Sequence, residues 1–369
     1  MQRMMRPAAL ALAGLCALVL AARAQQAQAP QPQERFGERV EVREVLIDAL
    51  VTDARGNVIV GLDKGDFEVR ENGKPVNLTG VTFYSNRRLL EGSSVVAKKG
   101  IRIDQIPEDR YFILFFQDQK ANALDAPQLL QQQIEAGRRA RAWVAKDLLP
   151  NDWVAVASYD YKLKVHQDFT HGRDDLQRAI DDAVQGKDTE NNWPSRISSQ
   201  GNPSLIAGLP RGNELRDRTA TIYDGIRLLA EAAGKITGRK NLMLFTNGFG
   251  RIQTFGQYVP DPRYYPPMVK ALNNNNVAVY AIDLVPIGTQ HTLSDAMNQL
   301  ASDTGGRYYY DVVNFETPLQ QAAKENSGYY LLSYRAEHPA GQSGFQPVQV
   351  RTTNPELKVR ARKGYYYGP

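Results

Sequence analysis

The chain has 369 residues, with 45 lysines and arginines against 40 acidic residues and a formal charge of +5. This near balance offers no basic footprint for nucleic acid. The one cysteine, Cys16, excludes a disulfide within the chain and a site built from several thiolates. The length is sufficient for two domains that are stabilised by core packing.

The N-terminus has the pattern of an export signal. Arg3 and Arg6 precede an apolar run at 8–22, which is too short to span a bilayer, and Ala22-Arg23-Ala24 is a small-x-small cleavage site. We predict that residues 1–24 are a signal peptide and that the mature protein is periplasmic or extracellular and does not span the membrane. The alternative is an N-terminal anchor. Cleavage removes three arginines and no acids, which leaves a charge of about +2.

Residues 25–39 are rich in Gln and Pro and are predicted to be a flexible linker. Residues 40–106 are predicted to be a β segment followed by a connector. Apolar residues alternate along this segment, and Asn72-Gly73 is a hairpin-turn signal. The expected strands lie at 40–51, 58–60, 67–70 and 81–84.

Residues 107–326 alternate between strand and helix patterns, which is typical of βαβ units with right-handed crossovers. The fold class predicted for this domain is α/β, with a doubly wound, mostly parallel sheet. The expected strands are 111–116, 153–159, 163–167, 242–246, 277–283 and 307–310, and the expected helices are 128–147, 174–184, 219–237, 266–273, 293–304 and 315–326.

Residues 327–369 return to a strand pattern, with strands expected at 329–334, 346–352 and 357–363. This segment and the first β segment each contain too few strands to bury a hydrophobic face alone. We therefore expect the two to combine into one composite β-sandwich domain, on the face of the α/β domain opposite its ligand edge.

Polar residues follow two of the buried strands. Gln117, Asp118 and Gln119 end the first strand of the α/β domain, and Asn247 follows a later one. Ligands bind outside the carboxyl ends of strands in open α/β sheets, so these residues mark a candidate ligand edge. A threonine before Tyr223, either Thr219 or Thr221, would add a hydroxyl there.

Two loops, 186–212 and 248–267, are longer than usual connections, and loops of this length are often functional. Both are expected at the ligand edge, where aromatic side chains would form a recognition surface. The candidate recognition residues are Trp193, Phe255, Tyr258 and Tyr264.

Five motifs occur together in this chain: FEVRENGKP at 67–75, YDG at 223–225, LASDTGG at 300–306, YYLLSY at 329–334 and RARKGY at 360–365. With them, the chain resembles the von Willebrand factor A-related proteins described chiefly from acidobacteria, over nearly its whole mature length. The resemblance implies a von Willebrand factor A-like fold. It also implies an adhesion site in which Asp-x-Ser-x-Ser, Thr-Asp-Gly and a loop threonine hold a divalent cation.

In the register of that family, the first three ligand positions are Gln117, Gln119 and Ala121, and the second aspartate is Asn247. Sliding the register by one gives Asp118, Lys120 and Asn122 instead. Mg²⁺ prefers carboxylate ligands, so the resemblance implies a degenerate site that needs no metal or other cofactor. The vestigial ligand-binding edge comprises Gln117, Asp118, Gln119, Thr221 and Asn247.

No motif nominates a catalytic residue. The chain has no P-loop and no zinc-protease histidine pair, and His166 and His171 are expected to be solvent-exposed. We expect an exported, non-catalytic binding or scaffolding protein whose partner is a protein or a cell-envelope polymer. The alternatives are a cation-dependent adhesion module and an exported hydrolase.

Overall fold

A computed structural model describes residues 40–85, 109–119, 127–189, 201–252, 258–289, 291–339 and 341–368. The chain divides into two compact units, Met1–Val40 and Glu41–Pro369. The predicted signal peptide and linker lie outside the described residues. Within those residues, no helix is long and apolar enough to cross a membrane.

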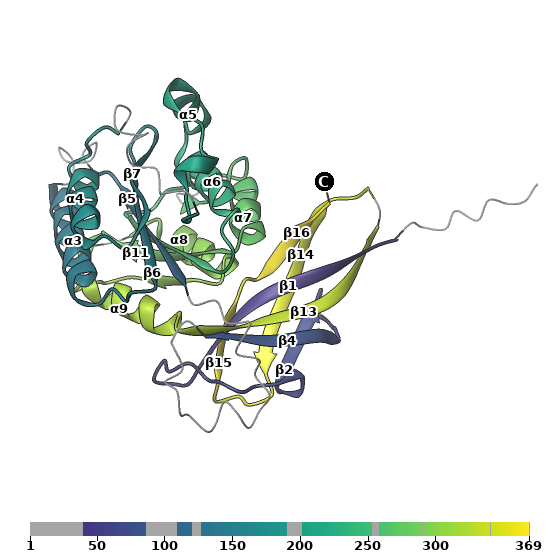
Figure 1. The fold of residues 1–369 in the computed structure, drawn as a ribbon. Coiled ribbons are helices and arrows are strands. Elements are labelled where there is room, and N and C mark those ends of the chain that lie inside the picture. Colours follow the sequence, from purple (N-terminus) through teal and green to yellow (C-terminus); the bar gives the residue numbers. More distant parts are fainter. Residues whose placement is uncertain are drawn as a thin grey trace, which may run out of the picture. The chain divides into compact units, whose positions relative to one another are not determined.

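The second unit contains a mixed α/β fold built on a six-stranded sheet (Figure 1). All neighbouring strands are parallel except the last pair, in which β7 runs antiparallel to β6. The predicted alternation of strands and helices is confirmed. In sheet order the strands are β12 (Arg307–Tyr309), β11 (Val277–Asp283), β8 (Lys240–Thr246), β5 (Arg110–Gln117), β6 (Asp152–Tyr159) and β7 (Leu163–Thr170).

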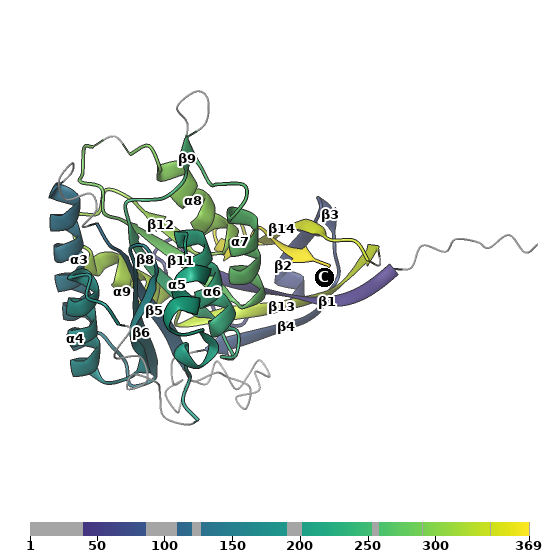
Figure 2. The same cartoon turned by 90° about the horizontal axis from the view of Figure 1, so that it is seen from above.

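Helices cover both faces of this sheet (Figure 2). Successive side chains of a strand point to opposite faces, so Phe112 and Leu114 join one core while Ile113 and Phe115 join the other. The first core is covered by α3 (Pro127–Lys146), α4 (Arg173–Val184) and α9 (Glu316–Glu325). The second is covered by η6 (Ile206–Gly208), α5 (Gly212–Arg218), α6 (Ile222–Ala233), α7 (Tyr265–Asn274) and α8 (Ser294–Asp303).

The helix predicted at 219–237 begins later than expected. Its N-cap is Thr221, whose hydroxyl accepts a hydrogen bond from the backbone N–H of Asp224. A capping threonine adopts extended backbone geometry, so the helix cannot continue backwards through it. The preceding residues form α5, a separate short helix that ends at Arg218.

Strands from the two predicted β segments, 40–106 and 327–369, occur together in two four-stranded sheets. One sheet has the order β15-β1-β13-β4 and the other β16-β14-β2-β3, so each combines strands from before and after the α/β residues. One apolar cluster, including Ile47, Phe67, Tyr330 and Val348, draws side chains from both sheets. The strands are β1 (Val40–Thr52), β2 (Phe67–Glu71), β3 (Lys74–Pro75), β4 (Leu78–Ser85), β13 (Gly328–Pro339), β14 (Gly344–Thr352), β15 (Lys358–Ala361) and β16 (Gly364–Tyr367).

Three local details of the β residues bear on the sequence predictions. Asn72 and Gly73 both have positive φ, at 48° and 77°, and β2 pairs with β3 across them, which confirms the hairpin. The strand predicted at 58–60 makes only an isolated bridge between Val58 and Thr52. The strand predicted at 357–363 ends at Ala361, and β16 follows it.

Candidate functional site

The strand order of the six-stranded sheet locates its ligand edge. The chain winds outward from β5 through β6 to β7, then returns to the other side of β5 with β8, β11 and β12. The order therefore reverses between β5 and β8. In doubly wound sheets, ligands bind outside the carboxyl ends of the strands at this reversal. Those ends carry Gln117 on β5 and Thr246 on β8, where the sequence predicted them.

Gln117 and Thr246 are hydrogen-bonded to each other across the reversal. The Thr246 hydroxyl donates to the side-chain oxygen of Gln117 and accepts a bond from the N–H of Gly248 at 2.8 Å. The neighbouring carboxamide oxygen of Asn247 is buried and has no hydrogen-bond partner within the described part of the chain. This acceptor is therefore unpaired but closed to a ligand from solvent.

Gln119 belongs to the interior, which corrects its predicted place at the ligand edge. It is fully buried, and its backbone N–H donates to the Gln133 side-chain oxygen at 2.6 Å. The Gln133 amide donates in turn to Asp118 at 3.3 Å and to the carbonyl of Val184 at 2.8 Å. A buried amide needs partners for its donors and acceptor, and Gln133 on α3 finds them in this turn.

The two candidate threonines serve local structure. Thr221 caps α6, and its hydroxyl also donates to the Asp224 carboxylate at 2.7 Å. Thr219 is fully buried; its hydroxyl donates to the Leu215 carbonyl at 2.7 Å and accepts the N–H of Leu163 at 3.1 Å. Both hydroxyl groups are thus used by the helices and strands around them.

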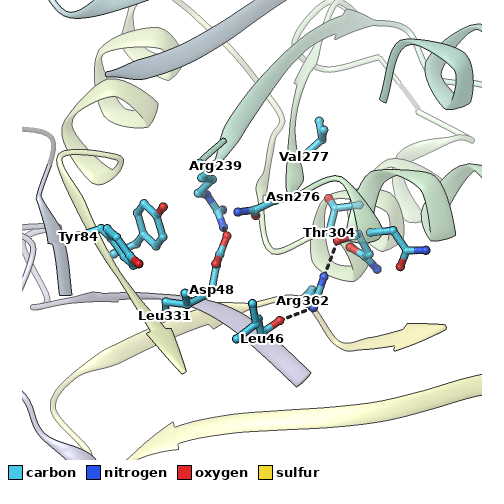
Figure 3. Close-up of a pocket in the computed structure, with 13 residues that line it drawn as sticks. Leu46, Asp48, Tyr84, Arg239, Asn276, Val277, Thr304, Leu331 and Arg362 are labelled. Atoms are coloured by element: carbon cyan, nitrogen blue, oxygen red, sulfur yellow. Dashed lines mark hydrogen bonds and ion pairs between the residues drawn. The ribbon is translucent and has the colours of Figure 1, made fainter. Parts of the chain in front are cut away.

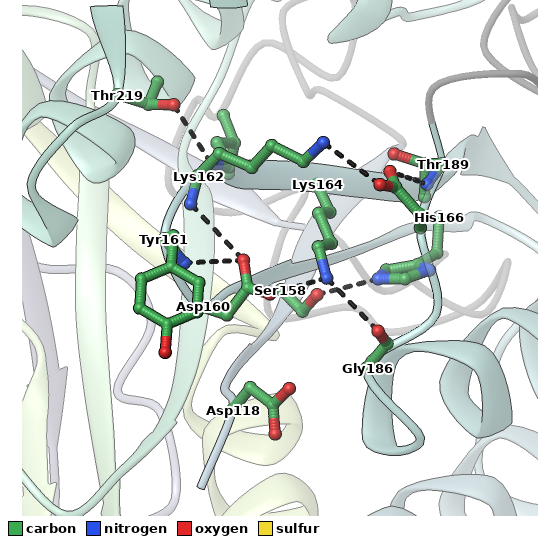
Figure 4. A network of polar contacts seen from close by, with 12 residues as sticks. Asp118, Ser158, Asp160, Tyr161, Lys162, Lys164, His166, Gly186, Thr189 and Thr219 are labelled. Carbon is green, nitrogen blue, oxygen red and sulfur yellow. Dashed lines mark hydrogen bonds and ion pairs between the residues drawn. The ribbon is translucent and has the colours of Figure 1, made fainter. Parts of the chain in front are cut away.

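An ion pair lies at the adjacent end of β6 (Figure 4). Lys164 Nζ is 2.8 Å from Asp160 Oδ2 and donates to the Gly186 carbonyl at 3.2 Å. Burial would raise the pKa of Asp160, but the hydrogen bond and charge of Lys164, together with the backbone N–H groups of Tyr161 and Lys162, outweigh it and the pKa is lowered. The Asp160 carboxylate therefore stays ionised, and its contact with Lys164 links the two ends of the β6–β7 turn.

His166 is buried, which corrects the prediction that it is solvated. Its Nε2 lies 2.7 Å from the Ser158 hydroxyl, and both residues are almost completely inaccessible. This serine–histidine pair is therefore closed to a substrate from solvent. His171 is solvent-exposed, as predicted, with its ring centroid 3.7 Å from that of Trp153 and its Nδ1 2.9 Å from the Asp152 carbonyl oxygen.

A second polar cluster lies at the same edge of the sheet and was not predicted from the sequence. His291 Nδ1 lies 2.7 Å from Asp283 Oδ2 and 3.1 Å from the Tyr308 hydroxyl, which itself donates to Asp283 at 2.6 Å. His291 Nε2 lies 2.9 Å from the Asn247 carbonyl oxygen, so the cluster adjoins the reversal point. Asp283 ends β11 directly beside Thr246, and this position at a strand end was the signal available in the sequence.

The surroundings of His291 favour its charged form. Burial would lower the pKa of His291, but the hydrogen bond and charge of Asp283 and the Asn247 carbonyl outweigh it, and the pKa is raised above its usual 6.5. Both ring nitrogens face acceptors, which suits an imidazolium that donates from each. The cluster lines a cavity of about 440 Å³ whose other walls include Ser294, Asp295, Tyr310 and Asp311.

Exposed apolar side chains gather at this edge too. Among the described residues, the three most exposed large hydrophobic side chains are Val313 at 86%, Tyr161 at 79% and Tyr310 at 68%. Tyr161 follows the carboxyl end of β6, and Tyr310 and Val313 follow that of β12. All three therefore lie past the ends of parallel strands that point to the ligand edge.

Of the four predicted recognition residues, the structure describes the side chain of Tyr264 alone. Trp193 and Phe255 lie outside the described residues, as do Lys120 and Ala121 of the first motif. Tyr258 belongs to a short hairpin of β9 (Arg251–Ile252) and β10 (Tyr258–Val259), but its side chain is not described. Tyr264 is half-buried and stacks on Tyr223 at 6.1 Å, so it contributes to the core.

The donors at the reversal fit a hard divalent cation poorly. Gln117 and Asn247 are neutral amides, Gln119 is fully buried, and Asp118 is the one carboxylate among the predicted edge residues. Mg²⁺ favours octahedral oxygen ligands with carboxylates among them. Within the described residues, no three His, Cys, Asp or Glu side chains group together as a metal site.

Comparisons with known proteins place the chain only by distant similarity. No protein-family model and no curated protein matches it. It is similar to proximal thread matrix protein 1 from the mussel byssus, with 13% identity and a TM-score of 0.35 over 59% of this chain and 48% of the mussel protein. The match thus spans about half of that protein's length.

Two prokaryotic structures show a comparable similarity. The conserved hypothetical protein BatB from Bacteroides thetaiotaomicron has 16% identity and a TM-score of 0.36, covering 58% of this chain and 98% of its own. The ArnB paralog VWA2 from Sulfolobus acidocaldarius has 8% identity and a TM-score of 0.34, covering 88% and 75%. Similarities this distant carry no argument about function, so the α/β assignment rests on the strand order and packing.

Proposed function

We propose that this chain is an exported, non-catalytic binding or scaffolding protein. Its recognition face is the edge formed by the carboxyl ends of the parallel strands. The observation that carries the proposal is the position of Tyr161, Tyr310 and Val313, the most exposed large apolar side chains among those described, at that one edge. Exposed aromatic groups on a rigid sheet are typical anchors of protein interfaces.

The polar groups of the same edge suit hydrogen bonding to a partner. The cavity beside Tyr310 is lined by Asp283, Asp295 and Asp311. These groups accept hydrogen bonds, so they match a partner that offers amine, amide or hydroxyl donors. A protein or a cell-envelope polymer supplies such donors.

We propose that recognition needs no divalent cation. The hydrogen bond between Thr246 and Gln117 supports this, because it uses side chains that a cation would otherwise recruit. Neutral amides would also give little compensation for stripping water from the ion. The edge is then a degenerate form of the adhesion site that the resemblance implies.

The β strands complete the proposed architecture. Because each four-stranded sheet mixes early and late strands, and one apolar cluster joins both sheets, we propose that they form one composite β-sandwich domain. The inaccessibility of the Ser158–His166 pair supports a non-catalytic role over an exported hydrolase.

Site-specific photocrosslinking in cells that express the full chain tests the proposal. A benzophenone amino acid replaces Tyr161 or Tyr310, and as a matched aromatic control it replaces Phe345, an exposed residue of β14. We expect adducts from the first two positions, unchanged by a chelator, and none from the third. Equal adducts at all three positions would contradict a recognition face. Adducts lost on chelation would favour the cation-dependent adhesion module.

A further inference from the structure

A second cavity lies at the opposite ends of the central strands, where β8 and β11 begin (Figure 3). Its volume is about 240 Å³. Strands β1, β4 and β13 contribute Leu46, Asp48, Tyr84, Tyr329 and Leu331 to the lining. The remaining polar and charged lining residues are Arg239, Asn273, Asn274, Asn276, Thr304 and Arg362.

The lining carries more positive than negative charge. Asp48 is the one acid among the lining residues, whereas Arg239 and Arg362 are both cationic. Arg239 and Asp48 are buried, and their closest nitrogen and oxygen are 3.9 Å apart, too far for a hydrogen bond. Whether Asp48 is charged or neutral, the two guanidinium groups leave the cavity with net positive charge.

Several polar atoms of this cavity lack hydrogen-bond partners among the described residues. They are Nε of Arg239, Nε of Arg362 and Oδ2 of Asp48. Arg239 and Arg362 direct their other nitrogens to backbone carbonyls: Arg239 donates to Gly305 at 2.8 Å, and Arg362 donates to Asn273 and Leu46. These three atoms are themselves buried, and burying charged groups without matched partners is costly, so the residues around the cavity do not neutralise one another fully.

Burial dominates the titration of the charged groups around this cavity. It raises the pKa of Asp48, although Arg239 and Arg362 act in the opposite direction, and it lowers the pKa of Arg362. Burial also lowers the pKa of Lys240, the first residue of β8, to about 8, with only partial compensation from Asp48.

We propose that this cavity binds a small anion, a carboxylate or a tetrahedral oxyanion such as phosphate, between Arg239 and Arg362. Guanidinium groups present paired donors that match the oxygens of such anions. The site is separate from the proposed recognition face, since it lies at the amino ends of β8 and β11. The walls of the cavity come from β1 and β13 on one side and from the starts of β8 and β11 on the other. A bound anion therefore stabilises the contact between these strands.

Isothermal titration calorimetry of the full chain with inorganic phosphate or acetate, and with chloride at matched ionic strength, tests this proposal. The Arg362→Gln variant should bind the anion about tenfold more weakly, because it loses a charge-assisted hydrogen bond. At a pH above the raised pKa of Asp48, the Asp48→Asn variant should bind it at least about threefold more tightly, because it removes a repelling carboxylate. Arg178→Gln, a change at an exposed arginine of α4, should leave the affinity unchanged.

The opposite directions expected for Arg362→Gln and Asp48→Asn separate anion binding from general destabilisation, and circular dichroism confirms that each variant is folded. Absence of binding heat from both anions in the wild type would overturn the proposal and indicate a water-filled cavity. Affinity changes of the same sign in the two variants would overturn it as well.

Discussion

The Thr246 hydroxyl donates a hydrogen bond to the side-chain oxygen of Gln117 and thereby joins the ends of β8 and β5 where the strand order reverses. The same hydroxyl accepts the N–H of Gly248, so one side chain closes the reversal point and shapes the turn after β8. The reversal point between β5 and β8 is therefore closed by a hydrogen bond between neutral side chains.

Replacing Thr246 with valine should destabilise the fold by about 1–3 kcal/mol, because Gln117 and the Gly248 N–H lose a buried partner. Urea unfolding measures this change. The same substitution at Thr353, an exposed residue after β14, is the control and should change stability by less than about 0.5 kcal/mol. Equal effects at the two positions would show that the Thr246 bond contributes nothing.

His291 should make stability depend on pH. Its pKa is raised above 6.5 in the folded state, so its contribution is complete below the unfolded value of 6.5 and is lost as pH rises through the folded pKa. The difference in unfolding free energy between wild type and His291→Gln should therefore shrink with rising pH above 6.5. A difference that grows with pH would contradict the imidazolium assignment, and NMR titration of the ring gives an independent value. Asp283, Tyr308, Asp295 and Asp311 share its cavity and are unchanged between the two proteins compared.

The Arg110–Asp152 pair should be critical for stability. Both side chains are buried, and the guanidinium contacts both carboxylate oxygens, at 2.5 and 2.7 Å, across the start of β5 and β6. Asp152→Asn leaves a buried charge without its partner and should cost about 3–5 kcal/mol. Asp181→Asn removes the half-exposed partner of Arg141 and should cost about 1 kcal/mol or less. Similar losses in the two variants would contradict this ranking.

Deleting residues 329–369 should unfold the early β strands. Strand β13 lies between β1 and β4, and β14 pairs with β2, so the deletion removes the partners of all three. Hydrogen exchange should show lost protection of β1 amides, while β5 amides keep theirs because β6 and β8 remain. Protected β1 amides in the truncated chain would refute the shared-sheet arrangement.

The sequence predicted the α/β elements well because apolar periodicity follows from burial. The runs ending at Gln117 and Thr246 are buried throughout, and their strands lie where expected. The helix predicted at 219–237 instead begins at α6, because Thr221 caps it. Apolar periodicity alone does not indicate such a cap.

Side-chain placement at the edge was less predictable, because it depends on contacts between distant residues. Gln119 is fully buried, and its backbone N–H bonds Gln133, which lies on another element. His291 meets Asp283 and Tyr308 only after β11 and β12 pair. Aligning a motif assigns residues to positions along one strand. It does not predict which residues of other strands and helices those positions contact.

The central claim, that the ligand edge acts without a divalent cation, is tested most directly by thermal melting with and without millimolar Mg²⁺ or Mn²⁺. A cation that binds the folded state raises the melting temperature by mass action. The combined variant Gln117→Asp, Gln119→Ser, Ala121→Ser and Asn247→Asp restores the family ligands and is the positive control, with a shift of several degrees expected. We predict coincident curves for the wild type. A wild-type shift of several degrees that Thr221→Ala abolishes would contradict the account.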